Sequence, residues 1–251
     1  TCCLGNGFDI HGGGGDVLFP HHENEIAQSE AATGETYVNT WMHVGFVQVN
    51  AEKMSKSLNN FFTIREVLKQ YHPEVLRYFI AASHYRSPLN YSDAALDQAK
   101  QALERFYATL GALLNASAGE PATTADYEAR FAAAMNDDFN TPEALAVLYE
   151  LVREANRCDK AGDAMGAAQF ANLLKRLGAI LGLLQYEPEA FRQAGAGDAA
   201  FIMEVEALIA EITAVRQAKN FQRSDEIRAQ LQVMGVAVEF SREGIRWRKA
   251  D

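Results

Sequence analysis

The sequence predicts a mostly α-helical protein with mixed α/β parts at both ends. We expect an α/β segment over residues 1–88, a helical bundle over 89–192 and a small mixed α/β unit over 198–251. Short apolar runs among glycines and histidines, leucines at helical spacing, and two β-like runs after the last helix are the three observations behind this expectation. The chain has 251 residues and is 48% hydrophobic, which is enough apolar material for such cores.

The N-terminal segment mixes short apolar runs, such as residues 44–49, with loop signals. Pro20 stands where a helix can begin, because proline is favoured in the first helical turn. This texture is typical of an α/β arrangement of strands and helices.

The middle of the chain carries apolar side chains at alternating steps of three and four. Ser92 is a plausible N-cap for the first such helix, whose stripe is Leu96, Ala99, Leu103, Phe106, Leu110 and Leu113. After a loop at 117–125 and a second helix, Thr141 and Pro142 suit the N-cap and first turn of a third. A fourth stripe covers residues 170–181, so the sequence predicts a bundle.

Small residues at 193–198 predict a linker to the last unit. Two helices follow, with apolar stripes over 201–215 and 227–234, and Gly235 can close the second. Residues 236–240 and 245–247 are then predicted to form two strands around a turn.

Composition excludes several classes of protein. Without a run of about 18 apolar residues the sequence predicts no membrane span, and its three cysteines form no disulfide framework. We therefore expect a reducing compartment, the cytoplasm. A net charge of −10 argues against a polyanionic partner, but the last fifty residues carry equal numbers of basic and acidic side chains.

A lysine pair marks the first candidate site, within the run Lys53-Met54-Ser55-Lys56-Ser57. Two ammonium groups on one loop can offset the charge that builds on a reacting phosphorus and a departing pyrophosphate. Lys53 and Lys56 are therefore candidate catalytic and ATP-binding residues. The alternative is an ordinary solvated loop.

A second candidate site lies between His11 and Glu25. Glycines 12–15 let backbone approach a nucleotide closely, and Asp16 can accept hydrogen bonds from ribose hydroxyls. His21 and Glu25 stand four apart, so on a helix both can reach one Zn²⁺. Two ligands do not complete a zinc site, and a surface histidine beside an acidic partner is the alternative.

Together these motifs resemble the cysteinyl-tRNA synthetase family of class I aminoacyl-tRNA synthetases. The resemblance covers the whole chain. It rests on residues 8–14, 18–28, Trp41-Met42-His43, the lysine run, Tyr85-Arg86-Ser87, Leu89-Asn90-Tyr91, residues 137–142 and Arg246-Trp247-Arg248.

The resemblance implies that residues 1–88 are the remnant of a class I nucleotide-binding catalytic domain. The implied enzyme activates L-cysteine with ATP and Mg²⁺ to cysteinyl-adenylate and transfers it to the 3′ end of tRNA(Cys). A zinc ion that binds the substrate thiol would distinguish cysteine from serine, because Zn²⁺ favours a thiolate over a neutral hydroxyl.

Carried over position by position, His21 and Glu25 are two zinc ligands and His11 lies against the substrate cysteine. Lys53 and Lys56 bind the ATP phosphates and stabilise the transition state of adenylation. Asp16 is implied to lie near the nucleotide.

The chain departs from the family at its start. The family's His-x-Gly-His motif is absent, and Cys2 and Cys3 do not align with the family's two cysteine zinc ligands. We therefore expect a C-terminal portion that is inactive alone and binds zinc weakly. The complete enzyme is expected to be a monomer.

The tail is expected to bind tRNA, because Arg246, Trp247 and Arg248 combine cations with a stacking surface. The alternative is that Trp247 packs in a small core. Two rival functions are a tRNA-binding module without catalysis and the related ligase that joins cysteine to an amino sugar in mycothiol synthesis. The unit at 201–251 counts against the second rival, which lacks it.

Overall fold

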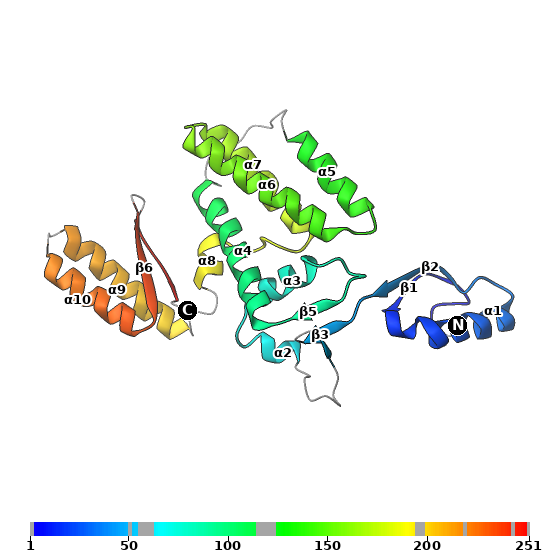
Figure 1. The fold of residues 1–251 in the computed structure, drawn as a ribbon. Helices are drawn as coiled ribbons and strands as arrows, with labels where there is room; N and C mark the ends of the chain where they lie inside the picture. The colour runs from blue at the N-terminus through cyan, green and yellow to red at the C-terminus, as the bar shows by residue number, and fades with distance from the viewer. Residues whose placement is uncertain are drawn as a thin grey trace.

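A computed structural model describes residues 3–49, 52–54, 63–113, 124–193, 199–217, 220–241 and 244–249. Within these ranges the chain is mostly helical, with three small sheets, and the two ends lie on opposite sides of a central helical bundle (Figure 1). None of the helices in the described ranges has both the length and the apolar character that crossing a membrane requires.

Strands and helices are mixed up to β5, the described elements from Asp93 to Val233 are helices, and two strands follow. The helices are α1 (Glu23–Thr33), α2 (Ile64–Val67), α3 (Pro73–Ala81), α4 (Asp93–Leu113), α5 (Ala125–Asn136), α6 (Thr141–Lys160), α7 (Ala164–Ile180), α8 (Pro188–Gln193), α9 (Ala199–Gln217) and α10 (Phe221–Val233). The strands are β1 (Phe8–Gly14), β2 (Val38–Val44), β3 (Val47–Val49), β4 (Glu52–Lys53), β5 (Leu89–Tyr91), β6 (Val236–Ser241) and β7 (Gly244–Lys249).

The N-terminal part is a β1–α1–β2 unit whose two strands are parallel. Its register pairs His11 with Trp41 and Gly13 with His43. Because side chains alternate along a strand, His11, Trp41 and His43 share one face of the sheet. A 3-10 turn (Gly15–Val17) and a kinked segment (Leu18–His22), in which the backbone of Phe19 is extended, lead from β1 into α1.

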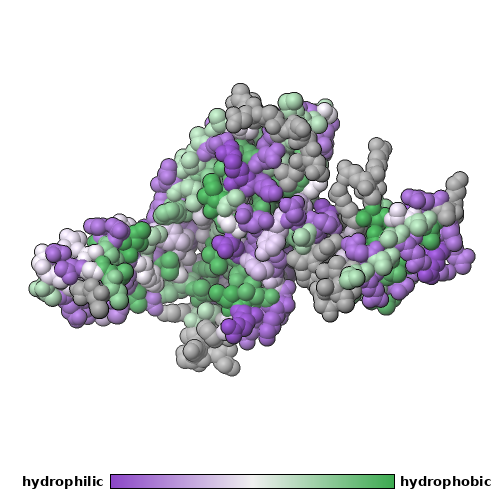
Figure 2. Space-filling view, turned by 180° about the vertical axis from the view of Figure 1, so that it is seen from behind, coloured by the Kyte–Doolittle hydropathy of each residue, from purple (hydrophilic) through white to green (hydrophobic). Residues whose placement is uncertain are grey.

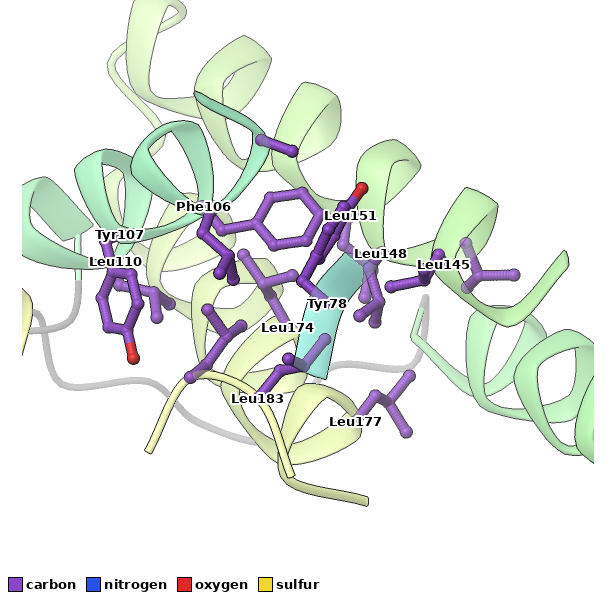
Figure 3. Close-up of a cluster of buried hydrophobic side chains, with 14 of the residues drawn as sticks. Tyr78, Phe106, Tyr107, Leu110, Leu145, Leu148, Leu151, Leu174, Leu177 and Leu183 are labelled. Atoms are coloured by element: carbon purple, nitrogen blue, oxygen red, sulfur yellow. The ribbon is translucent and has the colours of Figure 1, made fainter. Parts of the chain in front are cut away.

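The central bundle forms as the leucine stripes predict. Figure 3 shows side chains from α3, α4, α6 and α7 pointing into one cluster, and most of its leucines are fully buried. Ser92 caps α4, where its Oγ accepts a hydrogen bond from the backbone N–H of Ala95 at 3.2 Å. The buried cluster runs from Val67 to Phe191, so residues on both sides of the predicted boundary at 88/89 share one core.

One helix begins differently from the expectation. Asn140, not Thr141, is the N-cap of α6, and its side chain accepts from the backbone N–H of Glu143 at 3.3 Å. Pro142 lies in the first turn, as expected. Asparagine and threonine are both good caps, so spacing alone did not separate the two positions.

The C-terminal unit has its own core between α9, α10 and the β6–β7 hairpin. It contains Val205, Ile212, Ile227, Leu231 and Trp247. Gly235 ends α10 with φ +73, as predicted, because glycine adopts the left-handed region without a steric penalty. The linker predicted at 193–198 falls mostly outside the described residues, and α8 immediately before it was not predicted.

Glu74 is a buried carboxylate in the first turn of α3, with 3% of its surface exposed. It accepts hydrogen bonds from Oη of Tyr107 at 2.7 Å and from the backbone N–H of Gln185 at 3.1 Å. Burial raises the pKa of Glu74, and these hydrogen bonds only partly offset the rise. The folded protein therefore holds a proton at Glu74 more tightly than the unfolded chain, so its contribution favours folding below pH 4.5 and declines as the pH rises.

We expect the Glu74→Gln variant to gain stability relative to the wild type as the pH is raised from 4.5 toward neutrality. The measurement is the difference in melting temperature between the two proteins across that window. Glu66→Gln is the matched control. Hydrogen bonds from Thr63 lower the pKa of Glu66, so its contribution to stability is lost only as the pH falls below 4.5, and the difference between Glu66→Gln and the wild type should stay nearly constant above that pH. A flat difference for Glu74→Gln would contradict the prediction.

Candidate functional site

A cluster of imidazole and carboxylate groups forms where β1 and β2 face the start of α1. Nε2 of His21 lies 3.3 Å from Oε1 of Glu25, and Nε2 of His11 lies 3.7 Å from Oε2 of the same carboxylate. His11, His22 and Glu25 each offer one ligand atom within 4.8 Å of the others. The structure thus brings together the three residues assigned to zinc and substrate from the sequence and adds His22.

Two aromatic side chains of β2 support this cluster. The ring of His11 stacks on Trp41 with centroids 4.6 Å apart, and Nδ1 of His22 lies 2.9 Å from Nε2 of His43 in a hydrogen bond. Burial, and next the neighbouring His11, lower the pKa of His22. A neutral imidazole at physiological pH follows, which is the form that binds metals.

The cluster fits a zinc ion, because it contains buried polar atoms without hydrogen-bond partners. Nδ1 of His11 and Oε2 of Glu25 are both in this state. Such atoms are rare in folded proteins, and both of these are free to coordinate an ion. Histidine nitrogen and carboxylate oxygen are donors that Zn²⁺ accepts. Cys3 is exposed and lies outside the group; Cys2 lies outside the described residues.

The glycine run makes room for the chain's own side chains. A Cβ on Gly13 would lie 2.5 Å from Cε1 of His22, a distance that Cβ atoms essentially never reach. A Cβ on Gly14 would collide with the carboxylate of Asp16. Gly13 is therefore required for His22 to lie against β1. From the sequence we expected these glycines to let the backbone approach a nucleotide, which is a different function.

The described residues include only part of the predicted lysine site. Lys53 ends β4, which pairs with β3, and its side chain is not described. Lys56 lies outside the described residues. The assignments of Lys53, Lys56 and Asp16 to ATP therefore stay predictions.

The expectation that Trp247 offers a stacking surface is wrong. Its ring is 3% exposed within the C-terminal core, and its Nε1–H donates to Oε1 of Glu206 at 2.7 Å. Burying the indole and satisfying its N–H stabilises the unit, as the alternative interpretation held. For Arg246 and Arg248 only the backbone of β7 is described.

Sequence reasoning missed a different aromatic group on the same hairpin. Phe240 of β6 is 39% exposed, with the guanidinium carbon of Arg216 4.4 Å and that of Arg228 5.4 Å from its ring centroid. An exposed ring between two cations suits unstacked bases and their phosphates. The three residues are far apart in the sequence, so no local motif marks them.

Two family profiles match the chain. The profile described as tRNA synthetases class I (C) catalytic domain matches residues 1–101, and the DALR domain profile matches residues 130–185. The first range contains the His–Glu cluster, and the second covers most of α5 to α7.

The curated relatives are cysteine–tRNA ligases. Those of Azotobacter vinelandii and Stutzerimonas stutzeri are 61% and 60% identical over 251 residues, which is 100% of this chain and 54% of each relative. The chain therefore spans about half the length of the curated relatives it matches.

A solved structure also resembles the fold. In the ternary complex of Agrobacterium radiobacter K84 agnB2 LeuRS with tRNA and LeuAMS, the similar region covers 77% of this chain and 27% of that one, with a TM-score of 0.57 and 19% identity. At this identity the likeness supports a class I synthetase-like, mostly helical fold and nothing finer.

Proposed function

Because the chain belongs to the cysteine–tRNA ligase family of class I aminoacyl-tRNA synthetases, we propose that it provides part of an enzyme that attaches cysteine to tRNA(Cys). In the first step the carboxylate of L-cysteine attacks the α-phosphorus of ATP, and the bond to pyrophosphate breaks. In the second step a terminal hydroxyl of the tRNA attacks the adenylate carbonyl, and AMP leaves.

The His–Glu cluster is the observation that supports this proposal. His21 and Glu25 would hold the zinc ion, with His11 beside them and His22 oriented by His43. Zinc, when bound, would supply a Lewis acid that binds the substrate sulfur as thiolate and so discriminates against serine. Trp41 would cover one face of the His11 ring, on which it stacks.

The charged groups near the nucleotide complete the proposed site. Lys53 and Lys56 would neutralise the ATP phosphates and the departing pyrophosphate, together with Mg²⁺. Asp16 would bind ribose hydroxyls. We further propose that the complete enzyme is a monomer in the cytoplasm, in keeping with the free thiols of Cys3 and Cys158.

The test is cysteine-dependent ATP–pyrophosphate exchange with zinc present. We expect no exchange from this chain alone. Exchange should appear when the chain is combined with the part of the Azotobacter vinelandii relative that it does not cover. It should require cysteine rather than serine, and Lys56→Ala should abolish it.

Equal exchange with serine, or full exchange by Lys56→Ala, would contradict the proposed activity. Exchange by this chain alone, lost in Lys56→Ala, would contradict only the expected need for a second part.

A tRNA-binding module is the second candidate function for the chain taken alone. It is favoured by the arrangement of Phe240, Arg216 and Arg228 on the C-terminal unit. This candidate predicts binding of tRNA(Cys) with no exchange under any combination, so the same experiment with a tRNA-binding assay separates the two.

A further inference from the structure

A carboxylate on the turn between α5 and α6 is held by three consecutive residues that lie between α3 and β5. Asp138 accepts hydrogen bonds from Oη of Tyr85 at 2.6 Å and from Nε and Nη2 of Arg86 at 2.5 and 3.1 Å. Nε2 of His84 lies 3.9 Å from the same carboxylate. A bidentate guanidinium–carboxylate pair fixes orientation as well as distance. We call Tyr85, Arg86 and Asp138 the latch.

The turn that carries Asp138 has an uncommon backbone. Asp138 and the following Phe139 have φ values of 54 and 53, in the left-handed region that few residues other than glycine adopt. Two such residues in succession persist only where the surroundings hold them, and such strain concentrates at functional positions. Backbone hydrogen bonds from Phe139 and Asn140 back to α5 hold this turn, and the latch ties it to the segment that carries Arg86.

The other side of the latch continues to the candidate metal centre. The carbonyl of Tyr85 accepts a hydrogen bond from the backbone N–H of Gly45 at 2.8 Å, directly after the end of β2. That strand carries His43, whose ring is hydrogen-bonded to the ring of His22. A continuous series of contacts therefore joins the α5–α6 turn to the His–Glu cluster.

Phe139 adds an apolar contact region to the same junction. It lines a groove of about 670 Å³ together with Met42 and Val44 of β2, on the face of the strand opposite Trp41 and His43. Hydrophobic surface gathers in the centre of the molecule in the rear view (Figure 2). Phe139 is 53% exposed in this groove, so its apolar contacts are incomplete. We therefore expect the hydrogen bonds of the latch, more than the packing of Phe139, to fix the position of the α5–α6 turn.

We propose that Asp138 is a positioning residue that sets the orientation of the helical bundle relative to β2, so that tRNA held by the C-terminal parts reaches the metal centre. The second clause rests on the proposed function; the first does not. The latch is exposed, and such ion pairs contribute little to folding stability. Its expected effect is therefore on the orientation of the bundle and not on the melting temperature. Its partners hold the pKa of Asp138 at about 2, so the carboxylate stays charged at physiological pH.

The test compares Asp138→Asn with Asp137→Asn. Asparagine tolerates the left-handed backbone, so the first variant weakens the latch without new strain, while the second changes a neighbouring aspartate in the same turn. Spin labels at positions 28 on α1 and 165 on α7, both exposed, report the distance between the two parts in this chain, with Cys2 and Cys3 replaced by serine. Melting temperature and the combined enzyme's rates of exchange and tRNA charging are measured alongside.

We expect Asp138→Asn to broaden the distance distribution and to slow charging by up to about 100-fold, because small misplacements of reacting groups carry such costs. Exchange and melting temperature should stay at the level of Asp137→Asn. Arg86→Lys, which keeps the charge but loses the fork, should behave likewise and provides a second variant if Asp138→Asn folds poorly.

An unchanged distance distribution in both latch variants would overturn the proposal. A broadened distribution with unchanged charging would overturn its second clause alone. If the wild-type combination shows no exchange, the proposed function fails, while the distance measurement still decides the first clause.

Discussion

Alanine at Glu25 is expected to weaken zinc binding by this chain at least about 100-fold, because losing even an outer partner of a metal ligand costs about 10–100-fold. Glu25 is the one residue common to the pair predicted from the sequence and the group found in the structure. Its Oε2 is buried without a hydrogen-bond partner, so the site is already arranged for an ion. Competition with a chromophoric chelator measures the affinity.

Glu23→Ala is the control for this experiment, because Glu23 is an exposed carboxylate in the same first turn of α1. The zinc affinity of the Glu23→Ala variant should equal that of the wild type. His21→Ala should reduce binding as much as Glu25→Ala does. A larger loss from His11→Ala than from His21→Ala would assign the ion to His11 instead, and no loss from Glu25→Ala would exclude this cluster as the zinc site.

Alanine at Leu148 is expected to destabilise the bundle by about 2–5 kcal/mol, through lost burial and the cavity left behind. Leu148 of α6 is 0% exposed and lies among side chains from α3, α4 and α7 (Figure 3). For a protein of this size the loss corresponds to a fall of about 4–20 °C in melting temperature. Circular dichroism during heating measures it.

Ile180→Ala is the matched control for Leu148→Ala. Ile180 ends α7 and is 62% exposed, so its truncation should change the free energy of unfolding by less than about 0.5 kcal/mol. Equal effects of the two substitutions would show that the bundle is packed differently from the structure described above.

The helical bundle was the part of the fold most open to prediction from the sequence. Leucine stripes with steps of three and four reflect local geometry, and α4, α6 and α7 appear where those stripes lie. The hairpin after Gly235 was predicted for the same reason, since its signals are also local. The exact cap of α6 was not, because two adjacent residues both make good caps.

The candidate site could be predicted only in part. His21 and Glu25 were paired by their spacing on one helix, which the sequence displays directly. The contributions of Trp41 and His43 depend on the parallel register of β1 and β2, which a sequence does not display. The pairing of Arg86 with Asp138 likewise joins residues 52 positions apart in the sequence.

The prediction for Trp247 failed for a related reason. A tryptophan between arginines fits a nucleic-acid surface and a small core equally well in sequence, and only the position of Glu206 on α9 shows which one applies. Phe240 was overlooked because its two arginines come from α9 and α10.

Among the described residues, the C-terminal core and the bundle core have no buried member in common. Substitutions that accumulate in one core therefore leave the packing of the other intact. In evolutionary terms, the surface around Phe240 can change without any compensating change in α4, α6 or α7. Under the tRNA-binding role proposed above, the preference for a nucleic acid can therefore change while the packing of α4, α6 and α7 stays the same.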